Sequence, residues 1–106
     1  MQLVTQVYTV TRHFPKDELY GLTIQIRRCA ISIPSNIAEG YGRNSTDDYL
    51  RFLRIACGSL YELQTQVEIS CNLQYLSKED FDRIYDASRE IERMLSSLIF
   101  KIENTK

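Results

Sequence analysis

The sequence predicts an all-α protein, an antiparallel up-down bundle of four helices that forms a single domain over residues 1–106. Apolar residues recur at alternating spacings of three and four along most of the chain, which is typical of helices with one buried face. With 4 Gly and 2 Pro, the chain has few places for long loops or β-turns. Its 106 residues, 43% of them hydrophobic, suffice for one ordinary core.

The first helix is expected to begin at or very near Met1, because its apolar stripe starts there without a capping residue before it. The residue before a proline is disfavoured in the α region, so Pro15 ends this helix. The stripe consists of Leu3, Val7, Val10 and Phe14.

The second helix is predicted to open at Pro15, with Asp17 and Glu18 facing the positive end of its dipole. Pro34 falls inside its apolar stripe and removes one backbone hydrogen bond, so a kink is expected there. The stripe continues beyond this proline, which favours one kinked helix over two separate helices. Gly40 and the residues after it end the helix. The stripe consists of Leu19, Leu22, Ile26, Cys29, Ile33, Ile37 and Gly40.

Two serines mark the starts of the remaining helices. Ser45 with Asp48, and Ser77 with Asp80, resemble capping boxes with Asp in the place of Glu or Gln. The third helix then extends to about Cys71, and the fourth carries the most regular stripe of the chain. The stripe of the fourth helix consists of Phe81, Ile84, Ser88, Ile91, Leu95, Leu98 and Ile102.

A second set of apolar residues lies off these stripes. Two interpretations stay open: the residues widen the core of the bundle, or they form a surface that is buried between subunits. The set consists of Ile24, Ile31, Ala38, Ile55, Ile69, Tyr85, Met94 and Ile99.

No catalytic or metal-binding pattern is evident. His13 is the only histidine, so the Glu-x-x-His pairs of a carboxylate-bridged metal site are missing. Gly40 and Gly42 follow a helix instead of a strand, which argues against a phosphate-binding loop. We therefore expect no enzyme activity and no cofactor. The three cysteines are widely spaced on apolar stripes and are expected to be small buried hydrophobes: Cys29, Cys57 and Cys71.

Charge and hydropathy bear on location and partners. No apolar stretch approaches the roughly 20 residues of a membrane span, and the N-terminus lacks the pattern of a signal peptide. We expect a cytoplasmic protein with no membrane partner. The net charge is −1, but residues 1–60 hold 7 Lys and Arg against 5 Asp and Glu, so a local basic excess lies in the first half.

The most informative stretch of the sequence is 25–40. Arg27 and Arg28 point about 100° apart on a helix, so they do not face one partner together. Asn36 is expected to satisfy carbonyls freed by the proline kink, and Glu39 to pair with an arginine such as Arg43, Arg51 or Arg54.

Together with residues 41–45, 52–63 and 91–95, this stretch closely resembles the four-helix family of 23S rRNA intervening-sequence proteins. The similarity extends from Phe14 to Ile102, and this chain starts inside the longer first helix usual in the family. The resemblance implies a ring-like homo-oligomer, commonly a pentamer, without catalytic residues. The accessory protein of diversity-generating retroelements is a similar relative, which implies a basic surface that binds nucleic acid and a reverse transcriptase.

Two hypotheses follow. The first is a homo-oligomeric scaffold, a pentamer by the resemblance, that binds RNA or other nucleic acid through a basic surface. The second is a protein-protein adaptor whose arginines form bridges between helices and subunits, which the sequence pI of about 5.8 favours. The candidate contacts are Arg27, Arg28, Arg43, Arg51 and Arg54, and the structural motif comprises Pro34, Asn36, Glu39 and Gly40.

Overall fold

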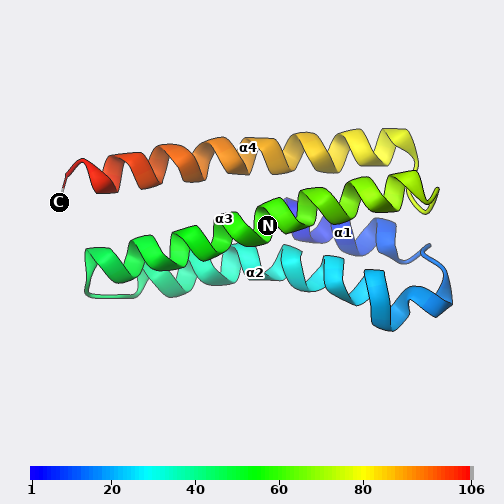
Figure 1. The fold of residues 1–106 in the computed structure, drawn as a ribbon, viewed down its shortest axis with the longest axis horizontal. Helices are drawn as coiled ribbons and strands as arrows, with labels where there is room; N and C mark the ends of the chain where they lie inside the picture. Colours follow the sequence, from blue (N-terminus) through cyan, green and yellow to red (C-terminus); the bar gives the residue numbers. More distant parts are fainter. Residues whose placement is uncertain (106) are drawn as a thin grey trace.

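The computed structural model describes residues 1–105 and contains four α-helices, which confirms the all-α four-helix fold (Figure 1). The three long helices α2, α3 and α4 lie side by side in alternating directions, and α1 packs against α2 and α4. No helix in this part of the chain is long and apolar enough to cross a membrane. The bounds are Gln2–Thr11 for α1, Ile24–Tyr41 for α2, Thr46–Asn72 for α3 and Lys78–Glu103 for α4.

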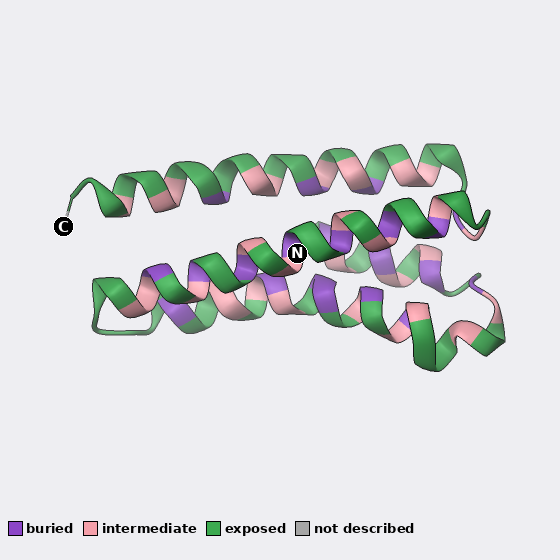
Figure 2. Ribbon diagram, in the orientation of Figure 1, coloured by how far each residue is buried: buried purple, intermediate pink, exposed green. Residues whose placement is uncertain are grey.

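The core lies along the axis of the bundle, where each helix turns one face inward (Figure 2). This follows from the sequence, because spacings of three and four place apolar residues on one side of a helix. The large inward side chains, each at most 3% exposed, are Leu3 and Val7 on α1, Ile26 and Ile33 on α2, Leu50, Leu53, Leu60, Leu63 and Val67 on α3, and Ile84 and Leu95 on α4.

Both predicted serine caps are confirmed. The hydroxyl of Ser45 accepts a hydrogen bond from the Asp48 N–H at 3.3 Å, and that of Ser77 accepts one from the Asp80 N–H at 3.0 Å. Each serine has an extended backbone, and acidic residues occupy the first turn of the helix that follows. The caps therefore fix where α3 and α4 begin.

The predicted start of the second helix is wrong. After Pro15 the chain forms a short 3₁₀ turn, Lys16–Glu18, and a π-helical turn, Leu19–Thr23, before α2 begins. The break lies at Gly21 (φ −110°, ψ −111°), where no Cβ opposes a non-helical backbone. The Glu18 carboxylate accepts the Leu22 N–H at 3.3 Å, and an α-helix would instead bond that N–H to the Glu18 carbonyl. The break leaves Leu19, which was assigned to the stripe, 46% exposed.

Pro34 lies inside α2, and the helix continues through it as one element, as the unbroken apolar stripe predicts. The kink expected at this proline stays a prediction.

The first helix is short, as predicted, and this shapes the whole molecule. The N-terminus lies near the middle of the long axis of the bundle (Figure 1). Its 10 residues span about 15 Å at 1.5 Å per residue, whereas the described molecule is 46 Å long. Four helices therefore pack together in one half of the bundle, and three in the other.

Close packing of α2 against α3 depends on Gly40. A Cβ at this position would lie 2.7 Å from Phe52 Cβ and 3.0 Å from Tyr49 Cδ1, whereas a Cβ at Gly58 of α3 would meet no atom within 4 Å.

We predict that Gly40→Ala lowers the free energy of unfolding by about 1–3 kcal/mol through overpacking. Gly58→Ala, the matched control, should raise it by up to about 1 kcal/mol through helix propensity.

Urea unfolding followed by circular dichroism measures both changes. Equal shifts of the two midpoints would contradict the role given to Gly40.

Candidate nucleic-acid interface

The five candidate arginines do not form one cluster in the structure. Arg27 and Arg28 lie in the second turn of α2, whereas Arg43 follows its end. Arg43 lies 16 positions after Arg27, which corresponds to about 24 Å of helix. Arg51 and Arg54 belong to the first part of α3, on the other side of the α2–α3 loop from Arg43. The fold therefore separates the candidates into two groups.

The group near the α2–α3 loop is paired with acidic side chains. Arg43 forms an ion pair with Glu39, as predicted, and Arg51 lies 3.7 Å from a carboxylate oxygen of Asp48. Both guanidinium groups also lie over the Phe52 ring, at 4.8 and 4.6 Å from its centroid. The pairs are half-exposed, so each stabilises the fold only weakly, but they reduce the positive charge offered to a partner.

Arg54 connects two helices. Its guanidinium Nη2 donates to Glu103 Oε2 at 2.8 Å, which joins α3 to the last turn of α4. Sequence reasoning named Glu39 as the carboxylate for the nearby arginines, and the structure gives Arg54 a different partner from 49 residues away.

Arg27 and Arg28 form no ion pair with any side chain of residues 1–105. Arg27 Nε donates to the Thr11 hydroxyl at 2.8 Å, and its guanidinium lies 4.7 Å from the centroid of the Tyr8 ring. These contacts hold Arg27 half-buried against α1, whereas Arg28 is exposed on the next position of the helix. The prediction that the two side chains point in different directions is confirmed. No acidic side chain of residues 1–105 neutralises their charges, which can therefore act on a binding partner.

Two further cations, Arg12 and Lys16, accompany this pair, and sequence reasoning missed both. They line a groove of about 290 Å³ that also includes Arg27 and Leu19. A neighbouring groove of about 410 Å³ includes Arg27 and Arg28. We call Arg12, Lys16, Arg27 and Arg28 the α1–α2 basic face.

Two tyrosines border this face, one half-buried and one exposed. Tyr8 and Tyr20 line the groove of Arg28, and Tyr20 is 87% exposed because the irregular turn before α2 directs it outward. The acidic Glu18 of the same turn is already engaged, since it accepts hydrogen bonds from the Leu22 N–H and the Tyr75 hydroxyl. The bond to Glu18 raises the pKa of Tyr75 above its ordinary value.

The predicted structural motif brings α2 and α3 together. Asn36 Nδ2 donates to the Ser32 carbonyl at 2.8 Å and to the Ser32 hydroxyl at 2.9 Å. Pro34 has no N–H, so the carbonyl that loses its usual hydrogen bond is that of Ala30. Asn36 instead binds the carbonyl of Ser32. The Ser32 hydroxyl in turn lies 2.8 Å from that of Ser59 on α3, so Asn36 supports a polar contact between the helices.

Cys29 is buried, as predicted, whereas Cys57 and Cys71 are only half-buried. The thiol of Cys29 donates to Glu62 Oε2 at 2.8 Å. Burial, the bond to Glu62 and the charge of Glu62 raise the pKa of Cys29 to about 12. Because the thiolate is the reactive form, this thiol is unreactive near neutral pH.

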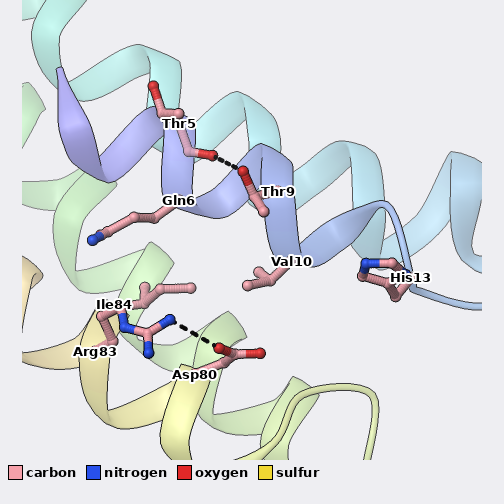
Figure 3. A pocket seen from close by; sticks show the side chains of 8 residues that line it. All are labelled: Thr5, Gln6, Thr9, Val10, His13, Asp80, Arg83 and Ile84. Atoms are coloured by element: carbon pink, nitrogen blue, oxygen red, sulfur yellow. Dashed lines mark hydrogen bonds and ion pairs between the residues drawn. The ribbon is translucent and has the colours of Figure 1, made fainter.

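A polar groove of about 240 Å³ lies between α1 and α4 (Figure 3). Three of its side chains are engaged with neighbours, since Thr9 donates to the Thr5 carbonyl at 2.9 Å and Arg83 pairs with Asp80 at 3.2 Å. The buried Oε1 of Gln6 accepts no hydrogen bond from residues 1–105. His13 lies at one end of the groove, and no hydrogen bond joins it to a serine, threonine or cysteine there. Within residues 1–105, no cluster of three His, Cys, Asp or Glu side chains is arranged to hold a metal ion.

Comparison with known proteins adds to this geometry. Residues 1–97 match the family described as 23S rRNA-intervening sequence protein. The chain belongs to this family. A solved structure of a protein of unknown function from the S23 ribosomal protein family of Bacteroides thetaiotaomicron has the same fold, with a TM-score of 0.85 and 24% identity over 92% of each chain. None of the curated proteins matches the chain.

As a 23S rRNA-intervening sequence protein, the chain carries four cations that form no ion pair within residues 1–105, Arg12, Lys16, Arg27 and Arg28, at the α1–α2 end of the bundle. The position of α1 against α2 assembles them, since Arg12 and Lys16 lie more than ten residues before Arg27.

The pKa of Cys29 leads to a prediction about stability. Its ordinary value is 9.0, so above pH 9 the unfolded chain loses the thiol proton while the folded chain keeps it. We predict that the free energy of unfolding falls by about 1–3 kcal/mol between pH 9 and pH 11 through this group. Urea unfolding of the wild type and Cys29→Ala measures it. The free energy of unfolding of the variant should fall less over this range. An equal fall in both proteins would show that the raised pKa is wrongly assigned to Cys29.

Proposed function

We propose that this chain is a non-enzymatic, homo-oligomeric scaffold of the cytoplasm that binds RNA through the α1–α2 basic face. The observation that carries the proposal is the contrast between the two arginine groups. Arg27 and Arg28 form no ion pair in residues 1–105, whereas Arg43, Arg51 and Arg54 all have acidic partners. The family name, which refers to 23S rRNA, supports RNA over DNA as the first ligand to test.

The chemistry of the face suits a flexible RNA strand. Arg and Lys side chains pair with phosphates, and binding then depends strongly on salt because counterions are released. Tyr20 offers an exposed ring on which an unpaired base can stack, as in other proteins that bind single strands. The net charge of −1 is compatible with this function. A ring of subunits repeats the basic face, and the electrostatic potentials of the repeated faces add together.

We predict that Arg28→Glu weakens binding to a single-stranded RNA of mixed sequence by about tenfold or more at 50 mM salt, because it removes one phosphate contact and adds a repulsion. The slope of log K against log salt should fall by about one. Fluorescence anisotropy of a labelled RNA between 50 and 200 mM salt measures both quantities, and the same titration with DNA of the same sequence tests the choice of RNA.

The matched control is the double variant Arg51→Glu and Arg54→Glu, which reverses two arginines that already have acidic partners. It should keep most of the RNA affinity. If wild-type binding showed no salt dependence, or if the control lost as much affinity as Arg28→Glu, the assignment of the α1–α2 basic face would be wrong.

Self-assembly rests on the apolar residues off the core stripes. The isoleucines Ile31, Ile55 and Ile69 are 43%, 42% and 43% exposed, so the described chain does not bury them as a wider core would. Ile31 precedes Ser32, and Ile55 lies one turn before Ser59, so both flank the contact between these two serines. A further subunit that covers this face would remove the exposed apolar surface, which is uncommon on monomers.

We predict a mass of five times 12.4 kDa, the pentamer expected from the family resemblance, in size-exclusion chromatography with light scattering. Ile31→Glu with Ile55→Glu should shift the protein toward the monomer, because a buried unpaired charge opposes association. Phe100→Glu, a control at an exposed apolar residue of α4, should leave the mass unchanged. A monomeric wild type would refute the ring.

The second candidate is a protein-protein adaptor, and the bridge between Arg54 and Glu103 favours it. In that function the arginines hold helices and subunits together, and a protein such as a reverse transcriptase is the partner that the family resemblance implies. The variants above separate the candidates. Loss of the oligomer in the Arg51→Glu and Arg54→Glu variant supports the adaptor, whereas loss of RNA binding alone in Arg28→Glu supports the scaffold.

A further inference from the structure

A buried hydroxyl without a partner lies at the α1–α2 basic face. Thr23 is 3% exposed, and its Oγ1 forms no hydrogen bond within residues 1–105. A buried donor that stays unpaired costs free energy, so folded proteins keep few of them. Thr23 lines both grooves of the face and therefore lies on the wall that they share. A ligand in these grooves would give this hydroxyl the hydrogen bond that it lacks.

The smaller groove, of about 290 Å³, presents positive charge alone. Arg12, Lys16 and Arg27 line it, and none of them forms an ion pair within residues 1–105. In this part of the chain no acidic side chain lines the groove. Its occupant is therefore expected to be an anion of more than one negative charge.

Arg27 is held beside this groove in advance of any ligand. Its Nε donates to the hydroxyl of Thr11 at 2.8 Å, and that hydroxyl donates to the Val7 carbonyl at 2.8 Å. The terminal nitrogens of Arg27 donate no hydrogen bond within residues 1–105. A guanidinium with free terminal nitrogens binds two phosphate oxygens at once. The contact with Thr11 thus orients Arg27 and leaves its phosphate-binding edge unoccupied.

These groups suit a phosphate at the end of a strand. A phosphate monoester carries about −1.5 to −2 charges near neutral pH and has three acceptor oxygens, whereas a phosphodiester within a strand carries one charge. Three cations and a free hydroxyl match the monoester. A phosphate within a strand is also flanked by a sugar on each side, which hinders its approach to the buried Thr23.

The larger groove, of about 410 Å³, suits the rest of the terminal nucleotide. It shares Leu19, Thr23 and Arg27 with the smaller groove, so the two are adjacent. Tyr20 lines it and is 87% exposed, and proteins that bind single-stranded RNA stack bases on such rings. The two grooves therefore match the phosphate and the base of one nucleotide.

We propose that the α1–α2 basic face binds the terminal phosphate monoester of a single-stranded RNA, with the phosphate in the smaller groove beside Thr23 and the terminal base on Tyr20. This inference rests on the proposed RNA binding. It adds that the face recognises an end of the strand in preference to its interior.

The test compares single-stranded RNAs of one sequence, about ten nucleotides long, that carry a 5′-phosphate, a 3′-phosphate or hydroxyls at both ends. Each displaces an internally labelled hydroxyl RNA from the 106-residue chain in fluorescence anisotropy at about 100 mM salt. One phosphorylated form should bind about tenfold more tightly than the hydroxyl form. A hydroxyl RNA one nucleotide longer, which adds one phosphodiester, should gain less than about twofold.

Two variants locate the preference for the phosphorylated end. Thr23→Val removes the unpaired hydroxyl and should keep the fold, because that hydroxyl has no hydrogen bond to lose. Lys16→Ala removes a cation at an exposed position of the groove. Each should lower the preference to about threefold or less. The matched control is Lys101→Ala, at an exposed residue of α4, which should leave the preference unchanged.

Equal binding of phosphorylated and hydroxyl RNA would overturn this inference and leave the proposed RNA binding intact. If none of the RNAs bound, the proposed function would fail and this inference with it. A preference that both Thr23→Val and Lys16→Ala retained would also overturn it, because the added affinity would then arise elsewhere on the surface. Adenosine 5′-monophosphate should displace the labelled RNA much less well than the phosphorylated RNA, and equal displacement would make the ligand a free nucleotide.

Discussion

The close contact between α2 and α3 is the constraint on which the rest of the structure depends. At Gly40 the two helices approach so closely that no Cβ fits between α2 and Phe52. Further along the same contact, the Ser32 and Ser59 hydroxyls lie 2.8 Å apart, and Cys29 donates to Glu62. Hydrogen bonds buried between helices require a fixed register, because a displaced helix would leave these polar groups unpaired. The register of α2 against α3 then determines where α1 and α4 can pack.

The two halves of the bundle differ because α1 packs in only one of them. Where α1 is present, its C-terminal end lies against the start of α2, and Arg27 is held between Thr11 and Tyr8. This contact brings Arg12 near Arg27 and creates the α1–α2 basic face. Where α1 is absent, α2 and α4 leave an apolar groove between them. One helix length thus accounts for a charged surface at one end and an apolar surface toward the other.

Local signals in the sequence predicted most of the fold. The caps at Ser45 and Ser77 and the apolar stripes depend on residues within a few positions of each other, and the structure confirms them. The start of α2 was predicted wrongly for a local reason as well. The apolar spacing of Leu19 and Leu22 was weighed above Gly21, although the Glu18 carboxylate competes there for a backbone N–H. Side-chain competition of this kind leaves no trace in hydrophobic periodicity.

By itself, the sequence determined the helices, the family and the set of arginines worth examining, because stripes, caps and motifs are properties of neighbouring residues. Only the tertiary structure decided which arginines keep an available charge. Glu103 meets Arg54 from the far end of the chain, and Thr11 meets Arg27 across two helices. Those contacts depend on the register and length of packed helices, and a pattern of neighbouring residues contains neither.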